Sequence, residues 1–324
     1  RRFVHVEDLA LTLLVDAPFP QLVRSQYREQ LGSEAFALAR RAPRNCDVVW
    51  HPWNGTFLAA KAPAVATIHD VVPFAYPDPD RRKRLSQQQP FLRSAERSAA
   101  ILTDSQFSAG EIERRLRVAP WRIWTIPLGV GPLFSPGPVP AEAAGTGDYI
   151  LVLGTDEPHK NVRPLAQGAA RALEGRQTRL AGLGPSLPAG PVFERLGPAD
   201  EATLVDLYRG ALFLAAPGLY EGFGLPLLEA MACGTPVLAS RAGSYPEVCG
   251  EAAAYVDEPE DPLAWAAAIA SLHDDPKRRG ALREEGLRRA SAFTWERTAA
   301  STLDVLRAHA RPGEAAANAS AARS

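Results

Sequence analysis

Several residue types are scarce in this chain, and each scarcity excludes a class of protein. Three cysteines, Cys46, Cys233 and Cys249, occur among 324 residues, and none stands in CxxC spacing. This excludes a disulfide scaffold and a zinc ribbon, and it fits a reducing compartment. The six histidines are scattered without the spacing of a zinc site. No apolar run approaches the roughly 18 residues that a transmembrane helix needs, so we expect a cytoplasmic protein.

The chain is also poor in methionine, in lysine and, at its start, in glycine. Met231 is the only methionine, the chain opens at Arg1, and the first glycine is Gly32. Because translation starts at methionine, we expect the sequence to be a fragment or a processed chain. Only four of its 36 basic residues are lysines, so a lysine inside a motif, such as Lys160, stands out.

The overall composition is that of a globular protein with about two domains of roughly 150 residues each. Hydrophobic residues make up 46% and charged residues 23% of the chain, a balance typical of folded domains. The formal net charge of −1 provides no overall field to attract nucleic acid. Residues 1–130 hold 18 basic and 13 acidic residues (net +5), whereas the remainder holds 18 and 24 (net −6).

Strand-like and helix-like stretches alternate in both halves, which predicts two α/β units with parallel sheets. Ser108, followed by Glu111, has the spacing of a capping box and predicts a helix start. A Pro-, Gly- and Ala-rich stretch at 135–148 predicts a linker, and the low-complexity stretch 312–324 predicts a disordered tail. The expected strands are 11–15, 47–50, 64–68, 100–103, 122–126, 149–153, 192–196, 212–215 and 236–239. The expected helices are 21–41, 88–100, 108–116, 162–174, 263–272, 276–293 and 295–310.

The most informative stretch reads YEGFGLPLLEAMACGTPV, at 220–237. Pro226 favours a helix start, the preceding glycines let a ligand approach the backbone closely, and the free N–H groups of a helix start attract an anion. Glu221 lies before this start and Glu229 after it. Two solvated carboxylates are the alternative interpretation. With the glycine loop between them, the pair instead predicts a diphosphate site in which one carboxylate binds hydroxyls and the other faces a reacting sugar.

This stretch resembles the E-x7-E motif of retaining glycosyltransferases in the glycosyl transferases group 1 family, with Glu221 and Glu229 in the motif positions. The resemblance covers roughly residues 10–310 and implies the GT-B fold of two facing Rossmann-like domains. These would be an acceptor domain at 1–134 and a nucleotide-sugar domain at 149–294, with a helix at 295–311 crossing back to the first. The other matching segments, in family order, are IHDVVPFAYPD at 68–78, TDSQFSAGEI at 103–112, IPLGV at 126–130, GTDEPHKN at 154–161, SYPEV at 244–248 and FTWERTA at 293–299.

The resemblance also implies roles for individual residues. Glu221 and His69 would be catalytic, both near the transferred sugar, and Glu229 would bind the ribose hydroxyls of the donor. Lys160 and the backbone N–H groups of 222–225 would bind the diphosphate. The implied donor-binding residues are Lys160, Glu229, Gly222, Phe223, Gly224, Leu225, Gly154, Thr155 and His159. The resemblance further implies that no metal and no resident cofactor are needed, and that the nucleotide diphosphate sugar is a co-substrate.

The chain departs from the family pattern at four places. Thr155 and His159 stand where many members have arginine, which leaves Lys160 as the only permanent cation expected on the diphosphate. Gly218 stands where serine is usual. The strand and glycine-rich loop that open the family's first domain have no counterpart before residue 11. We therefore expect a first domain that lacks this element, with impaired activity.

Three further features each allow a structural and a functional interpretation. DPD at 78–80 has the DxD pattern of metal-dependent glycosyltransferases, but among prolines it is typical of a turn. RRKR at 81–84 is typical of a solvated loop, or of a basic contact with a membrane surface. WHPW at 50–53 fits core packing, or stacking on an acceptor sugar.

We hypothesise a cytoplasmic retaining glycosyltransferase that moves a hexose from a nucleotide diphosphate sugar to a saccharide or lipid-linked acceptor. Within the family, the EGFGLP variety of the motif resembles that of mannosyl-type enzymes of cell-surface polysaccharide assembly, which implies mannose as the sugar. A peripheral contact of the basic first half with the inner membrane face is left open, and no nucleic-acid partner is expected. Two alternatives also stay open: a non-catalytic nucleotide-sugar-binding protein, and another GT-B enzyme such as a nucleotide-sugar epimerase.

Overall fold

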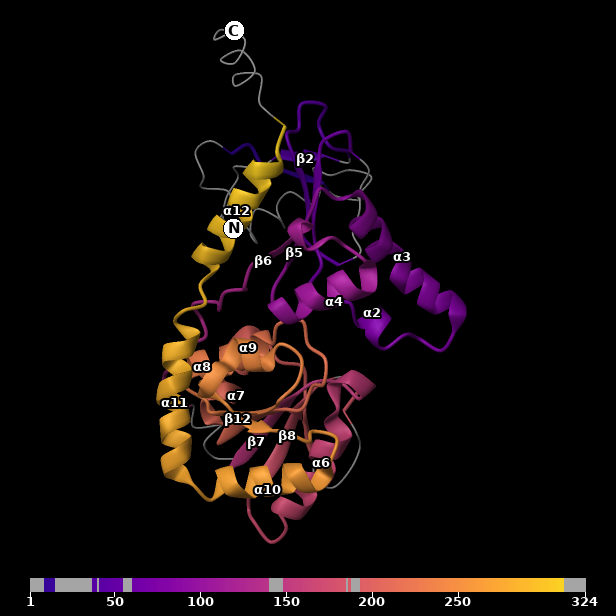
Figure 1. Cartoon of the computed structure of the whole chain (residues 1–324). Coiled ribbons are helices and arrows are strands. Elements are labelled where there is room, and N and C mark those ends of the chain that lie inside the picture. The colour runs from indigo at the N-terminus through magenta and orange to yellow at the C-terminus, as the bar shows by residue number, and fades with distance from the viewer. Residues whose placement is uncertain are drawn as a thin grey trace. The chain divides into compact units, whose positions relative to one another are not determined.

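The computed structural model describes residues 9–14, 37–39, 41–54, 60–139, 148–184, 186–187 and 193–311, whose course is drawn in Figure 1. They form two compact units. The first holds the residues up to Thr103, Ala109–Ile126 and the residues from Trp295 onward, and the second holds Asp104–Ser108 and Pro127–Thr294. The sequence assigned 127–134 to the first domain, whereas these residues group with the second unit. Most of the expected linker, 140–147, and the expected tail, 312–324, lie outside the described residues.

The first unit contains a four-stranded parallel sheet in the order β3–β4–β5–β6. β4 and β5 are buried along their whole length, as is usual for the central strands of a parallel sheet. Val305 and Leu306 of α12 (Trp295–His309) pack against Val65 and Leu102 of these strands. The strands are β3 Val49–His51, β4 Ala64–Thr67, β5 Ala100–Thr103 and β6 Ile123–Thr125. All four lie where the sequence predicted them.

Two predictions for this unit are wrong in part. RRKR at 81–84 is the first turn of helix α3 (Arg81–Arg97), because the Asp80 carboxylate accepts a hydrogen bond from the Lys83 amide and caps the helix there. α4 (Gln106–Leu116) begins two residues before the expected start at Ser108. Ser105 is its capping side chain, since its Oγ accepts from the Ser108 amide at 3.0 Å. The remaining helical segments are α2 Val72–Ala75 and the 3-10 turn η3 Pro120–Arg122.

A separate two-stranded parallel pair joins β1 (Thr12–Leu14) and β2 (Ala37–Ala39). β1 was expected to be a buried strand at 11–15, but it is half-buried. β2 corrects the predicted helix at 21–41 at its carboxyl end, because the Ala37 amide donates to the Leu11 carbonyl and residues 37–39 pair with β1. Alternating Ala and Leu fit either structure, so their spacing could not decide between them. The rest of that predicted helix lies outside the described residues, apart from Arg41.

The second unit contains a six-stranded parallel sheet in the order β12–β11–β10–β7–β8–β9. Its strands are β7 Tyr149–Leu153, β8 Arg179–Leu183, β9 Phe193–Leu196, β10 Phe213–Ala216, β11 Val237–Ser240 and β12 Ala254–Val256. The predictions at 149–153, 192–196, 212–215 and 236–239 are confirmed, whereas β8 and β12 were not predicted. The chain first lays β8 and β9 on one side of β7, and then places β10 on the other side. The boundary between β7 and β10 is therefore the point where the strand order reverses.

Helices and apolar residues cover both faces of this sheet. Trp265 of α10 is fully buried, and α10 packs on α6 so closely that a Cβ at Gly168 would lie 2.6 Å from the Trp265 Cβ. Figure 1 shows α6 and α10 next to each other. On the other face, Leu227, Leu228 and Met231 of α8 are buried in the core. The helical segments are η4 Pro158–Lys160, α6 Val162–Ala172, α7 Glu201–Gly210, α8 Leu225–Cys233, α9 Tyr245–Cys249, η5 Gly250–Ala252, α10 Pro262–His273 and α11 Pro276–Ala290.

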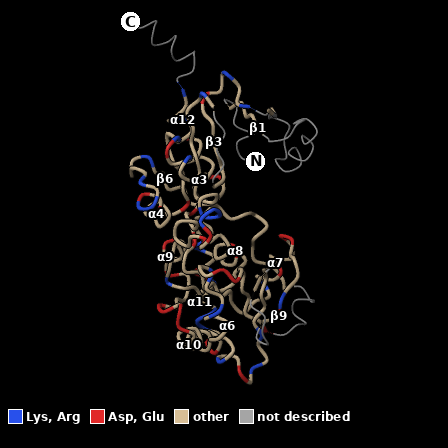
Figure 2. The backbone as a smooth tube through the Cα atoms, turned by 90° about the vertical axis from the view of Figure 1, so that its right-hand side faces the viewer, with Lys and Arg blue, Asp and Glu red and all other residues tan. Residues whose placement is uncertain are grey.

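None of the described helices has both the length and the apolar character needed to cross a membrane. Acidic and basic residues are interspersed along the second unit, as Figure 2 shows.

Candidate functional site

The strand order of the second unit marks one end of its sheet as the place for a ligand. In open α/β sheets, ligands bind at the carboxyl ends of the strands, where the strand order reverses. A small cavity of about 70 Å³ lies at this place, lined by Leu153 at the end of β7 and Leu214–Ala216 of β10. The other lining residues are Lys160, Glu221, Gly224, Pro226, Leu227 and Tyr245. Two of the sequence-predicted charged residues, Lys160 and Glu221, therefore share one cavity.

Lys160 and Glu221 are paired directly. The Lys160 Nζ donates to the Glu221 Oε1 at 2.5 Å, and the two side chains are 29% and 22% exposed. Their loops are also joined through the backbone, because the Leu219 amide donates to the His159 carbonyl at 2.8 Å. The fold therefore brings a cation and a carboxylate together at the cavity while both stay accessible to a ligand.

The loop that carries Lys160 follows β7 and is held by close packing. Gly154 lies against Gly184, where a Cβ would come 1.8 Å from the Gly154 carbonyl oxygen, so only glycine fits at position 184. The Thr155 hydroxyl donates to the Glu157 carboxylate at 2.7 Å. His159 is buried. Among these residues, Lys160 is the one whose side chain lines the cavity.

The loop between Glu221 and α8 is held by serine hydroxyls on its carbonyl groups. The Gly222 carbonyl accepts from the Ser105 and Ser108 hydroxyls at 2.5 and 3.1 Å. The Phe223 carbonyl accepts from the Ser244 hydroxyl at 2.8 Å. All three serines are buried. The hydroxyls therefore fix the direction of two successive peptide groups.

The direction of these peptide groups leaves their amides available. A trans peptide group is planar, so its N–H points away from its C=O. With the Gly222 and Phe223 carbonyls facing the serines, the N–H groups of Phe223 and Gly224 face the opposite way, and they make no hydrogen bond to the described residues. Gly224 adopts a left-handed conformation (φ 96°) directly before α8. The two amides and the start of this helix are donors suited to an anion, and Gly224 lines the cavity.

Glu229 lies within α8, not at the cavity wall. Its Oε2 accepts from the hydroxyl of the buried Tyr208 at 3.0 Å. Burial raises the pKa of Glu229 above its usual value, and the hydrogen bond from Tyr208 opposes the rise. The sequence did not identify Tyr208, because its partner is 21 residues away in the chain.

His69 lies in the first unit, just after β4, and its surroundings hold it in place. Its backbone amide donates to the Asn54 Oδ1 at 2.7 Å, and its Nε2 lies 3.2 Å from the Pro52 carbonyl. The Trp53 ring, 67% exposed, lies 5.3 Å from the imidazole between centroids. The WHPW cluster is thus divided: His51 is buried, whereas Trp53 is open to solvent. Core packing accounts for the buried His51 but not for the exposed Trp53.

Other candidate features have structural roles. In DPD, the Asp78 carboxylate accepts from the Asp80 amide and Asp80 caps α3, which is the turn that the sequence favoured. Among the described residues, no group of three or more His, Cys, Asp or Glu side chains is placed to bind a metal.

A larger cavity of about 330 Å³ lies in the first unit beside Pro63, Arg97 and Ser98. This cavity is at the amino ends of β4 and β5, whereas His69 follows the carboxyl end of β4.

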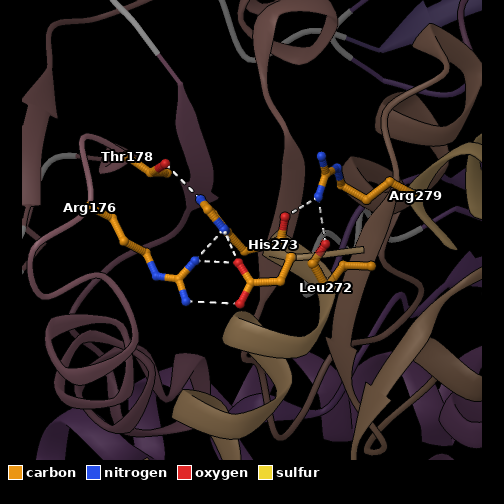
Figure 3. A network of polar contacts seen from close by, with 6 residues as sticks. Arg176, Thr178, Leu272, His273 and Arg279 are labelled. Atoms are coloured by element: carbon orange, nitrogen blue, oxygen red, sulfur yellow. Dashed lines mark hydrogen bonds and ion pairs between the residues drawn. The ribbon is translucent and has the colours of Figure 1, made fainter. Parts of the chain in front are cut away.

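A network of polar side chains at the end of α10 is also structural (Figure 3). Arg176 is paired with Asp274 and lies 2.7 Å from the His273 Nδ1, while the His273 Nε2 lies 2.9 Å from the Thr178 hydroxyl. Arg279 donates to the Leu272 carbonyl at 2.7 Å and also to the His273 carbonyl. Cationic side chains thereby satisfy the free carbonyl groups at a helix end.

The sequence identified the charged residues of the site but not the groups that hold it. The Ser105 hydroxyl, which the sequence analysis did not assign to the site, donates to the Gly222 carbonyl. The carboxylate of Glu247, in SYPEV, accepts from the Gln106 and Phe107 amides and caps α4. A hint was present, since the segments at 103–112 and 244–248 both matched the family.

Comparisons with known proteins agree on one family. The family model described as glycosyl transferases group 1 matches residues 140–289, and the one described as glycosyltransferase family 4 matches residues 6–132. An O-antigen chain mannosyltransferase B of Escherichia coli is 33% identical over 288 residues, covering 80% of this chain and 74% of that protein. An MMP alpha-(1->4)-mannosyltransferase of Mycolicibacterium hassiacum is 35% identical over 243 residues, 70% of this chain and 56% of that protein.

Solved structures show the fold. WaaG, a glycosyltransferase involved in lipopolysaccharide biosynthesis, matches with a TM-score of 0.66 at 16% identity, over 92% of this chain and 99% of that one. A sucrose-phosphate synthase from Thermosynechococcus elongatus matches with a TM-score of 0.66 at 22% identity, over 89% and 77%. Anabaena HepE in complex with UDP-glucose matches with a TM-score of 0.65 at 16% identity, over 76% and 73%. With a parallel sheet of four strands in one unit and one of six strands in the other, the chain has the GT-B fold predicted from its sequence.

Proposed function

Because this chain belongs to the glycosyl transferases group 1 family, we propose that it transfers a hexose, with retention of configuration, from a nucleotide diphosphate sugar to a hydroxyl of a saccharide or lipid-linked acceptor. One observation carries the proposal. Lys160, Glu221 and Gly224 line one cavity where the strand order reverses, and the amides of Phe223 and Gly224 make no hydrogen bond to the described residues. A cation and amide donors suit a diphosphate, and an adjacent carboxylate suits the hydroxyls of a sugar.

The proposed chemistry follows from where charge develops. Breaking the bond between the sugar C1 and the phosphate oxygen places negative charge on the leaving diphosphate. Donors already aimed at that charge lower the barrier without reorganising during the reaction. Lys160 and the amides of Phe223 and Gly224 supply such donors. The serine hydroxyls hold those amides in place before the ligand binds.

Retention is proposed to arise by attack from the front face of the sugar. The acceptor oxygen forms a bond to C1 on the face from which the phosphate oxygen leaves, and the acceptor proton passes to that phosphate oxygen. No side chain forms a covalent bond in this route. Glu221, paired with Lys160, is assigned to orient the sugar through its hydroxyls. His69, held by Asn54 and Pro52, is proposed to contact the transferred sugar.

The donor is proposed to carry mannose, because two similar proteins are mannosyltransferases by name. A thermal-shift panel of UDP, GDP, ADP and TDP tests the site and identifies the base. A nucleotide that binds only the native state stabilises it by about 2.7 kcal/mol at roughly a hundredfold excess over its Kd. One nucleotide is expected to raise the Tm clearly above the others. If none raises the Tm at millimolar concentration, the nucleotide-sugar proposal is wrong.

A lipid-linked acceptor is supported by helix α3 of the first unit. Its first turn exposes Arg81, Arg82 and Lys83, and the helix also exposes Leu85 (47%) and Leu92 (40%). Basic residues beside exposed apolar ones suit an anionic membrane surface. Co-sedimentation with vesicles containing phosphatidylglycerol, compared with pure phosphatidylcholine, tests this. Binding to the anionic vesicles that is lost in R81E/R82E is expected, and equal binding to both kinds of vesicle would contradict it.

A further inference from the structure

Tyr245 lines the same cavity as Lys160 and Glu221. The residue is 4% exposed, and its backbone amide donates to the Ala242 carbonyl. Its hydroxyl has no hydrogen-bond partner among the described residues. The hydroxyl is also not among the fully buried polar atoms without a partner, so it is open to the cavity although the rest of the side chain is buried. Such a group in a ligand cavity indicates a partner that arrives with the ligand.

The glycines of the loop determine where this hydroxyl lies. A Cβ at Gly224 would meet the edge of the Tyr245 ring at 2.9 Å. A Cβ at Gly218 would lie 2.9 Å from the Tyr245 hydroxyl and 3.3 Å from the Glu221 Oε1. The ring therefore passes under the loop along Gly224, and the hydroxyl lies beside the Glu221 carboxylate. Both glycines leave room for the tyrosine.

The two groups have complementary hydrogen-bonding properties. Burial raises the pKa of Tyr245 well above its usual value, and the Glu221 charge adds to the rise, so the phenol keeps its proton. A phenol is a donor, whereas a carboxylate only accepts. A neutral hydroxyl of a ligand can accept a hydrogen bond from the phenol and donate one to the carboxylate. A phosphate oxygen can accept from the phenol, but the adjacent carboxylate repels its charge.

We propose that Tyr245 is a sugar-binding residue, whose hydroxyl donates to a hydroxyl of the transferred sugar that itself donates to Glu221. The inference rests on the proposed function, because it requires a nucleotide sugar in this cavity. It adds a residue that contacts the sugar, separately from Lys160 and the amides, which contact the diphosphate.

Calorimetric titration of three proteins tests the proposal: the wild type, Tyr245→Phe and Tyr255→Phe. The Tyr255 hydroxyl donates to the Gly250 carbonyl at 2.7 Å, and Tyr255 does not line the cavity, so it is a matched control. The probes are UDP, UDP-glucose, GDP and GDP-mannose. Tyr245→Phe is expected to weaken binding of the accepted nucleotide sugar about three- to tenfold, the size of one lost hydrogen bond. Binding of the matching nucleoside diphosphate should change by less than about twofold, and Tyr255→Phe should change neither.

Thermal unfolding without ligand separates a ligand contact from a structural one. Tyr245→Phe removes a hydroxyl without a partner and should leave the Tm unchanged or raised, whereas Tyr255→Phe breaks a hydrogen bond and should lower it. Three results overturn the inference while leaving the proposed function intact. They are unchanged nucleotide-sugar affinity in Tyr245→Phe, equal weakening of nucleotide sugar and diphosphate, and a Tm lowered as in Tyr255→Phe. If the wild type binds none of the four probes, both proposals fail.

Discussion

The Lys160 ammonium and the Glu221 carboxylate are paired at 2.5 Å, across 61 residues of sequence. The pair joins the loop after β7 to the loop before α8, at the point where the strand order of the second sheet reverses. A diphosphate that attracts the ammonium would release the carboxylate to bind sugar hydroxyls. The pair thus couples the two halves of the proposed donor site.

Replacing Lys160 should weaken binding of the diphosphate. Lys160→Gln keeps much of the side-chain length but removes the charge. Because a hydrogen bond to a charged group contributes about 1.5–3 kcal/mol, the Kd of the preferred nucleoside diphosphate should rise about 10- to 100-fold. Lys277→Gln, at an exposed position in α11, is the control and should change the Kd by less than about twofold. Equal affinity in Lys160→Gln and the wild type would remove Lys160 from the site.

Replacing Glu229 should stabilise the protein in a pH-dependent way. Burial raises the pKa of Glu229, so between its usual pKa and the raised value the native state binds more protons than the unfolded state. Stability therefore falls as pH rises through this window, and at pH 7 the buried charge is a cost. Glu229→Gln has no charge and can still accept from Tyr208. Its Tm should exceed that of the wild type at pH 7, with the gain lost near pH 4.

The same Glu229 variant should bind the nucleotide more weakly, if the carboxylate binds ribose hydroxyls. Glu258→Gln, at an exposed position, serves as the control and should alter neither the Tm nor the affinity. A Glu229→Gln protein that is less stable than the wild type at pH 7 would show that the charged carboxylate stabilises the fold.

The hydroxyls of Ser105 and Ser108 should substitute for each other in part, because both donate to the Gly222 carbonyl. Each single alanine variant leaves one donor, whereas the double variant leaves the half-buried Gly222 carbonyl without a partner among the described residues. The double variant should lose about 1–3 kcal/mol of unfolding free energy, more than the sum of the singles. Denaturant unfolding measures this, with Ser291→Ala, at an exposed position, as the control.

Turnover should respond more strongly than stability in this double variant. The two serines set the direction of the Phe223 amide, and small misplacements of groups that face the reacting atoms are costly. At matched nucleotide saturation, we expect kcat to fall about tenfold or more. Unchanged kcat in the double variant would show that the carbonyl contacts do not orient the amides for catalysis.

The sequence predicted the sheets well because their strands are short apolar runs bounded by turn residues. Residues 100–103 and 149–153 are such runs, and their bounds are confirmed. β8 was missed because its sequence, RLAGL, contains Gly182, which weakens a strand pattern. That glycine is present because a Cβ would come 2.5 Å from the Leu187 Cδ1. The need for it arises from tertiary packing, which local patterns do not encode.

The charged residues of the site could be predicted from local sequence, but the hydrogen bonds that hold them could not. Glu221 and Lys160 are in motifs whose charges and glycines are visible in sequence. The hydrogen bonds that hold these motifs connect residues far apart, as Ser105 and Gly222 are, 117 positions from each other. The cytoplasmic location, the ribose contact of Glu229 and the role of His69 stay predictions.

A transfer assay tests the central claim most directly. The wild type and Glu221→Gln are incubated with the nucleotide sugar chosen by the thermal-shift panel and with saccharide and lipid-linked acceptors. Product is then measured together with its anomeric configuration. The wild type should form a product with the donor's configuration. Glu221→Gln should lose at least about a hundredfold in rate while still binding the nucleoside diphosphate. Transfer by Glu221→Gln at the wild-type rate, or binding of the nucleotide sugar by the wild type without transfer to any acceptor, would contradict the account.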